Sequence, residues 1–158
     1  GNSLFAAGKL AESERWFSKA LWLSSCGKVR DAPGELCSIL HGNRAFARVK
    51  LRKFAEAEED CSSALEQNPD NTKARYRRAL ARFEQGKMLR EALQDAERAI
   101  RELPDAAGKE AADLKQRIEE KLSAESKKGS AEAEEGGWRR MEIIEADDDD
   151  EDNTGFRR

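Results

Sequence analysis

The sequence contains few of the residues on which several classes of protein depend. Only three cysteines occur among 158 residues, Cys26, Cys37 and Cys61, and no two are spaced as CxxC. An odd count without that spacing favours neither a disulfide framework nor a thiol redox pair. The single histidine has no recognisable nucleophile motif as a partner, and no glycine-rich phosphate loop is present. We therefore expect no enzyme activity and no cofactor.

Long apolar runs and a strong net charge are also missing. No apolar run approaches the roughly 18 residues that a membrane span needs, and the first residues lack the basic and apolar regions of a signal peptide. We expect a cytoplasmic or nuclear protein without a membrane anchor. The 29 basic and 32 acidic residues nearly cancel, yet charged residues form 39% of the chain. Such a composition indicates a soluble, helix-rich protein with a thin core.

The acidic residues gather in the last part of the chain. Residues 127–158 contain eleven acidic and six basic residues, including an unbroken acidic run at 147–152. Like charges this close repel one another and bury no apolar area. We predict a disordered acidic tail over 127–158, whose boundary with the rest of the chain lies near the linker-like stretch KKGSAEAEEGG.

An internal repeat organises the rest of the chain. The same residue types recur 35 positions apart at four places, namely Ala57 and Ala92, Asp60 and Asp95, Ala64 and Ala99, and Pro69 and Pro104. Within each unit the apolar residues step by three and four, as an amphipathic helix requires, and a proline stops the second helix. Each unit is predicted to be a helical hairpin that buries its apolar face against a neighbour.

Three segments of the chain resemble successive tetratricopeptide repeats, namely GNSLFAAGKLAESERWFSKAL, GNRAFARVKLRKFAEAEEDCSSALEQNPDN and KARYRRALARFEQGKMLREALQDAERAIRELPD. The resemblance implies an all-α fold in which antiparallel helical hairpins stack as a right-handed superhelix over residues 1–105. The first repeat lacks its start and has Ser13 where the family prefers alanine, and the third has an extra residue around Met88. The chain opens within a repeat, so we expect it to be a fragment.

An apolar stripe after Pro104 predicts one more helix. We expect a capping helix over 106–126, with Asp105 as its N-cap and a mostly charged outer face. The stripe consists of Ala107, Ala111, Leu114, Ile118 and Leu122.

The first helix of each stacked hairpin lines a concave groove, and side chains four apart on such a helix share one face. On this basis the groove is predicted to be lined by Phe5, Phe46, Val49, Lys50, Tyr76, Leu80 and Phe83.

Two cations and two amides are predicted to meet in this groove. Lys73 and Arg77 lie one helical turn apart, a spacing that costs stability by repulsion unless an anion is present. Asn43 and Asn2 can donate from neighbouring helices, so the four side chains can converge on one carboxylate.

These four residues also resemble four of the five positions of the carboxylate clamp of co-chaperone tetratricopeptide domains. The fifth position, a lysine, would fall before Gly1. The resemblance implies a non-catalytic adaptor that binds the C-terminal Glu-Glu-Val-Asp peptide of heat-shock chaperones of the seventy or ninety kilodalton class.

The sequence leaves other functions open. The groove can instead hold an internal peptide or a helix of a partner protein.

Cys37 and His41 have the spacing of two metal ligands on one helix, but no second pair lies nearby, so we predict no metal site.

A basic concentration in the two central hairpins can also bind single-stranded nucleic acid. A net charge of only +2 for residues 1–126 and the absence of a per-repeat base-reading pattern disfavour that interpretation. The basic residues concerned are Arg44, Arg48, Lys50, Arg52, Lys53, Lys73, Arg75, Arg77, Arg78 and Arg82.

Overall fold

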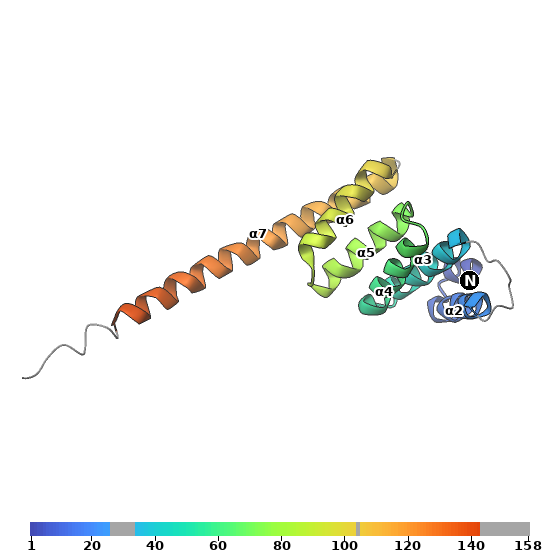
Figure 1. Cartoon of the computed structure of the whole chain (residues 1–158), viewed down its shortest axis with the longest axis horizontal. Coiled ribbons are helices and arrows are strands. Elements are labelled where there is room, and N and C mark those ends of the chain that lie inside the picture. Colours follow the sequence, from blue (N-terminus) through green and yellow to red (C-terminus); the bar gives the residue numbers. More distant parts are fainter. Residues whose placement is uncertain (26–33, 104, 143–158) are drawn as a thin grey trace, which may run out of the picture. The chain divides into compact units, whose positions relative to one another are not determined.

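The structure is a computed structural model that describes residues 1–25, 34–103 and 105–142, with side chains described up to residue 127 except at 104–107. Seven helices and no strand are found in these ranges (Figure 1). The helices are α1 (Asn2–Ala6), α2 (Leu10–Ser25), α3 (Gly34–Lys50), α4 (Phe54–Gln67), α5 (Thr72–Gln85), α6 (Leu89–Glu102) and α7 (Asp105–Glu142).

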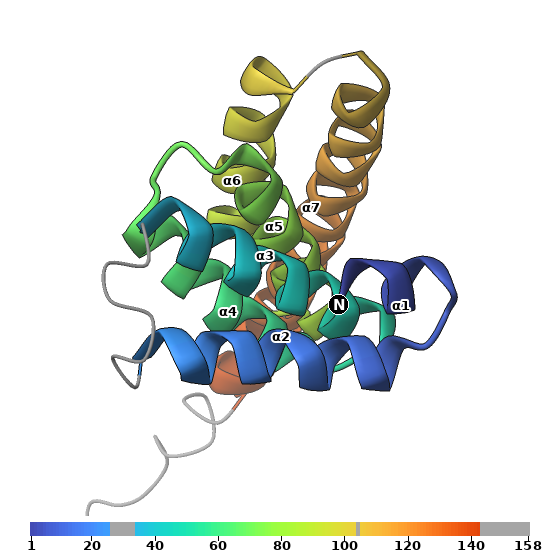
Figure 2. The same ribbon diagram turned by 90° about the vertical axis from the view of Figure 1, so that its right-hand side faces the viewer.

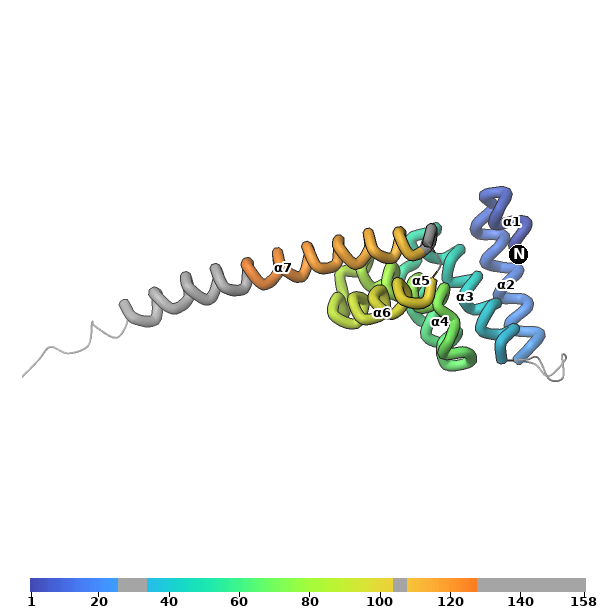
Figure 3. Tube along the Cα trace, turned by 90° about the horizontal axis from the view of Figure 1, so that it is seen from above, coloured from blue at the N-terminus to red at the C-terminus, as the bar shows by residue number. Residues whose placement is uncertain are grey.

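Consecutive helices pack on one another from α1 through α6. The chain thus forms the hairpins α1/α2, α3/α4 and α5/α6, and α3 also contacts α5 directly, lying between α2 and α5 (Figure 2). Seen from above, α1 runs beside the start of α2 at the N-terminal end of the stack (Figure 3). The predicted all-α stack of helical hairpins is confirmed.

Small side chains allow this close stacking. Ala57 and Ala92, which recur in the repeat, are fully buried. An alanine at a helix interface lets two backbones approach closely at no cost in side-chain entropy. The other alanines that are fully buried are Ala45, Ala47, Ala64, Ala74, Ala79, Ala81, Ala96, Ala99 and Ala111.

Two departures from the repeat pattern have a local structural role. Ser13 is fully buried, and its hydroxyl donates a hydrogen bond of 3.0 Å to the carbonyl oxygen of Gly1, which satisfies the polar group. The extra residue of the third repeat falls in the turn between α5 and α6. Gly86 ends α5 with φ of 67°, and Met88 precedes α6 with φ of 50°. Two left-handed residues close together let the turn absorb the insertion.

Three residues of the predicted apolar stripe of α7, Ala111, Leu114 and Ile118, are at most 1% exposed, whereas Leu122 is half-buried and the side chain of Ala107 lies outside those described. The helix continues to Glu142, so the expected boundary at residue 126 lies inside α7. Alanine, glutamate, lysine and arginine are strong helix formers, and they dominate the stretch beyond residue 126. The chain divides into the units Gly1–Glu120 and Lys121–Arg158. Residues 143–158, which hold the acidic run, lie outside the described residues, and their disorder stays a prediction.

None of the helices in the described ranges is both long and apolar enough to cross a membrane. Cys37 and Cys61 are free thiols, whereas Cys26 lies outside the described residues. Cys61 is fully buried, and burial raises the pKa of its thiol to about 12. Its thiol is therefore protonated at neutral pH, so it packs as a small apolar side chain.

Candidate functional site

Most of the cations that the sequence places in the central hairpins are neutralised inside the fold. Six of the ten form ion pairs with carboxylates of the chain, namely Arg44, Arg48, Lys53, Arg75, Arg78 and Arg82. The other four, for which the described residues provide no ion pair, are Lys50, Arg52, Lys73 and Arg77. The basic concentration is therefore mainly structural, which leaves little of the proposed nucleic-acid surface.

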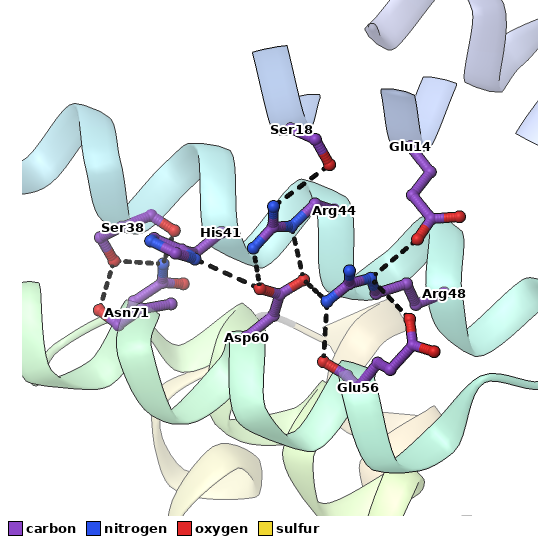
Figure 4. Close-up of polar contacts among 10 residues, drawn as sticks. Glu14, Ser18, Ser38, His41, Arg44, Arg48, Glu56, Asp60 and Asn71 are labelled. Carbon is purple, nitrogen blue, oxygen red and sulfur yellow. Dashed lines mark hydrogen bonds and ion pairs between the residues drawn. The ribbon is translucent and has the colours of Figure 1, made fainter. Parts of the chain in front are cut away.

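The best-developed ionic cluster surrounds Asp60 on α4, which is 3% exposed (Figure 4). The Arg44 side chain donates to both oxygens of this carboxylate, at 2.9 and 2.5 Å, and Nη1 of Arg48 donates at 2.9 Å. Nδ1 of His41 lies 3.3 Å from Oδ1 of Asp60. Arg48 also donates to Glu14 of α2 at 3.0 Å, so the cluster ties the first hairpin to the second.

The same arrangement recurs one repeat later. Arg78 donates to both oxygens of Asp95, and Arg82 bridges Asp95 and Glu58 at 3.0 and 2.7 Å. In the second and third hairpins, two arginines one turn apart on the first helix hold an aspartate of the second helix. The latter arginine also reaches a glutamate of the preceding hairpin. This ionic connection, which we call the repeat cluster, joins each hairpin to the next.

The repeat clusters make stability depend on pH. Burial raises the pKa of the Glu14, Glu58 and Asp60 carboxyls, but hydrogen bonds and nearby cations outweigh it, so each pKa lies below its ordinary value. Their stabilisation is present above the ordinary carboxyl pKa of about 4 and is lost as pH falls through the lower folded-state values. We expect urea unfolding near pH 3 to give a lower unfolding free energy than near pH 7. Equal values would contradict this.

Arg77 on α5 differs from the paired arginines. Its side chain is half-buried, and its one hydrogen bond within the described part of the chain runs from Nη1 to the carbonyl oxygen of Gly42, at 2.6 Å. Burial lowers the pKa of the Arg77 guanidinium, and none of the described carboxylates forms an ion pair with it to offset the loss of water. A buried cation without an anion costs folding free energy. The arrangement is suited to a negatively charged ligand.

An aromatic stack leads from α1 to Arg77. The rings of Phe5 and Phe46 stack with centroids 4.7 Å apart and an interplanar angle of 29°. The central carbon of the Arg77 guanidinium lies 4.5 Å from the Phe46 ring centroid, and Nζ of Lys50 lies 5.5 Å from the same point. One aromatic ring on α3 is thus contacted by two cations that form no ion pair with the described carboxylates.

The two predicted amides lie beside this stack. Nδ2 of Asn43 donates to Oδ1 of Asn2 at 3.4 Å, which links α3 to α1. Both amides line a pocket of about 180 Å³ that Phe5, Phe17 and Phe46 complete. The pocket combines amide groups with aromatic walls, a lining that accepts a small partly polar group.

Of the four predicted anion-binding residues, three lie close together in the structure. Asn2 and Asn43 touch, and Arg77 is anchored on Gly42, the residue before Asn43. Lys73 lies one helical turn before Arg77 on α5, is exposed, and makes no hydrogen bond with the other three in the described part of the chain. An exposed lysine on a long flexible stem can swing toward an anion that Arg77 holds.

The residues predicted to line the groove fall into different environments. Val49 is 9% exposed and packs in the core with Ala57 and Ala81, so it does not line the groove. Leu80 packs against the same cluster and is partly buried. This cluster joins α3, α4 and α5, and its apolar contacts hold Val49 inside the fold.

Two further predicted lining residues lie close to α7. The Arg117 guanidinium lies 4.7 Å from the Phe83 ring centroid. Burial, together with the negative charge of Glu110, raises the pKa of Tyr76. The capping helix thus occupies part of the face that the sequence assigned to the groove. Among the predicted lining residues, Phe5 and Phe46 line the pocket, and Lys50 adjoins it.

Phe17 and Gly42 belong to the site although neither was predicted there. Phe17 lies on the buried face of α2 and lines the pocket together with Asn2 and Phe5 of α1. Gly42 contributes a backbone carbonyl, which carries no sequence signal. The paired arginines do have a signal, because Arg44 and Arg48 recur as Arg78 and Arg82, 34 positions later.

The comparisons with known proteins agree on one family. The sequence profile of the family described as "Tetratricopeptide repeat" matches residues 43–107. Sperm-associated antigen 1 of Mus musculus is 33% identical over 105 residues, which are 66% of this chain and 10% of that protein. The chain therefore spans about a tenth of the length of this relative.

Two solved structures are similar over most of the chain. The first TPR of Spaghetti (RPAP3), bound to the HSP90 peptide SRMEEVD, has 33% sequence identity and a TM-score of 0.64, and the match covers 78% of this chain and 87% of that one. The second TPR domain of the human RPAP3 protein, in complex with the HSP70 peptide SGPTIEEVD, has 32% identity and a TM-score of 0.56. That match covers 75% of this chain and 88% of the other.

Proposed function

The chain belongs to the tetratricopeptide repeat family, to its carboxylate-clamp co-chaperone type, and we propose that it is a non-catalytic adaptor that clamps the C-terminal carboxylate of a chaperone tail peptide. Asn2, Asn43, Lys73 and Arg77 are the proposed clamp. The proposed partners are the acidic C-terminal peptides of heat-shock chaperones of the seventy or ninety kilodalton class.

The observation that carries this proposal is that Arg77 has no carboxylate partner among the residues that the structure describes. Five other arginines of α3 and α5 have carboxylate partners within the fold, whereas Arg77 has a carbonyl oxygen and an aromatic ring. A guanidinium has five N–H donors, of which the Gly42 carbonyl uses one. The remaining donors match the planar carboxylate, which arginine binds in a forked geometry.

A peptide C-terminus ending in aspartate has the chemistry that these donors require. Its terminal carboxylate and its side-chain carboxylate bring four acceptor oxygens within a short distance. Each charge-assisted hydrogen bond contributes about 1.5–3 kcal/mol. The peptides held by the two similar RPAP3 domains both end in EEVD.

We place this adaptor role in the cytoplasm, with the nucleus as a second compartment. Free thiols at Cys37 and Cys61 suit a reducing environment.

A free C-terminus is the feature that distinguishes the clamp from a groove for internal peptides. We expect an N-terminally labelled SRMEEVD peptide to bind, and its C-amidated form to bind at least about tenfold more weakly, since amidation removes one charge and its charge-assisted bonds. Fluorescence anisotropy measures both affinities. Equal binding of the two peptides would refute the clamp and favour an internal-peptide scaffold. Binding whose affinity falls steeply with salt and that requires no peptide C-terminus would favour a nucleic-acid ligand.

A further inference from the structure

Three groups from the first helices of all three hairpins form one continuous stack. Phe5 of α1 lies on Phe46 of α3, and Phe46 lies on the guanidinium of Arg77 of α5. The distances are 4.7 Å between the rings and 4.5 Å between the guanidinium carbon and the Phe46 centroid. Phe46 is the only member that touches both of the others.

The stack fixes the Arg77 side chain from one side, and a backbone group fixes it from another. Nη1 donates to the carbonyl oxygen of Gly42 at 2.6 Å. Gly42 is buried, and a Cβ atom added to it would lie 3.5 Å from Nη1, so the guanidinium fits closely against the α3 backbone. The guanidinium is thus held by two contacts, one with the Phe46 ring and one with the Gly42 carbonyl oxygen.

Besides the hydrogen bond to Gly42, the contact with Phe46 supports this position of the Arg77 guanidinium. The repeat clusters hold their arginines by ion pairs with aspartate and glutamate, but no such partner of Arg77 occurs in the ranges that the structure describes. A long flexible side chain loses rotamer freedom when it grips a ligand, and a preorganised one loses less. The face of an aromatic ring also attracts a cation that burial has separated from water.

We propose that Phe46 is a positioning residue for the anion site: its ring holds the guanidinium of Arg77 in the orientation that a ligand carboxylate requires. The inference rests on the proposed clamp function, because it assigns Phe46 a contribution to affinity that acts through Arg77. A residue that acts through another has no effect once that other residue is removed.

The test is a double-mutant cycle in binding of the labelled SRMEEVD peptide. Phe46→Leu keeps an apolar side chain of similar size but removes the aromatic face. We expect it to weaken binding about threefold to tenfold in the wild-type background. In the Arg77→Ala background the same substitution should change affinity less than twofold. Phe46→Tyr keeps the ring and should bind like the wild type.

Matched controls separate positioning from packing. Phe54→Leu makes the same chemical change at a partly buried phenylalanine of α4, next to the Val49 cluster, and should leave peptide affinity unchanged. Urea unfolding of each variant shows whether the fold is retained. Should Phe46→Leu fail to fold, Phe46→Tyr and Phe46→Met provide the same comparison of a ring with a flexible apolar chain.

The outcomes distinguish this inference from the proposed function. If the wild type does not bind the free-carboxylate peptide, the clamp itself fails. If the wild type binds, Arg77→Ala loses affinity, and Phe46→Leu either binds normally or weakens binding equally in both backgrounds, the clamp stands and the positioning role of Phe46 is overturned.

Discussion

Replacing Arg77 with alanine is expected to lower the affinity for a free-carboxylate chaperone tail peptide by tenfold or more. The substitution removes a planar donor that makes charge-assisted hydrogen bonds worth about 1.5–3 kcal/mol, and 1.4 kcal/mol corresponds to a factor of ten. Stability should change far less, by about 1 kcal/mol at most, because the lost hydrogen bond to Gly42 is offset by the removal of a buried cation without a carboxylate partner. Fluorescence anisotropy and urea unfolding measure the two quantities.

Two companion variants test whether charge or geometry matters. Arg90→Ala removes the same charge from an exposed position on α6 and should leave peptide affinity within about twofold of the wild type, since surface charges contribute little. Arg77→Lys keeps the charge but lacks the planar fork, so its affinity should fall between those of the wild type and Arg77→Ala. Wild-type affinity in Arg77→Ala would show that the carboxylate is bound elsewhere.

Replacing Asp60 with asparagine is expected to destabilise the fold by about 3–5 kcal/mol, which is a large part of the stability of a typical domain. The carboxylate accepts hydrogen bonds from both Arg44 and Arg48 and is 3% exposed. Asparagine is nearly the same size as aspartate, so the change mainly removes the negative charge that Arg44 and Arg48 share. The midpoint and slope of urea unfolding near pH 7 give the difference.

The matched control for this prediction is Asp70→Asn. Asp70 is exposed in the turn between α4 and α5, and its carboxylate forms no ion pair in the described part of the chain. That variant should unfold within about 0.5 kcal/mol of the wild type. Asp60→Asn should also show a smaller loss of stability on acidification, because one of the low-pKa carboxyls is gone. A change below about 1 kcal/mol in Asp60→Asn would mean that the repeat cluster contributes little to stability.

Two adjacent arginines of α5 have different roles: one is structural, and the other belongs to the proposed clamp. Arg77 and Arg78 are adjacent on α5, yet Arg78 grips Asp95 through two hydrogen bonds, while Arg77 faces Phe46 and the Gly42 carbonyl. Neighbours on a helix point about 100° apart, so one faces the second helix of its own hairpin and the other faces the preceding hairpin. The repeat cluster and the proposed clamp thus use different faces of one helix.

Parts of the candidate site could be predicted from the sequence because they follow from helical register. The contact of Asn2 with Asn43 and the position of Arg77 beside them fit the predicted shared face, and Phe5 and Phe46 line the pocket. Val49 fits the same register but packs inward, because register fixes the direction of a side chain only to within a helix face. The neighbouring helix then decides whether that face is covered.

The sequence by itself determined the period of the repeat, the helical hairpins and the burial of its small residues, because apolar spacing along one helix is a local property of the chain. Only the tertiary structure decided which cations are neutralised and which are available. Asp60 and Arg44 are 16 positions apart and belong to different helices, and Arg77 meets the Gly42 carbonyl across 35 positions. Ion pairs across helices depend on packing distances of a few ångströms, which no residue pattern along one helix specifies.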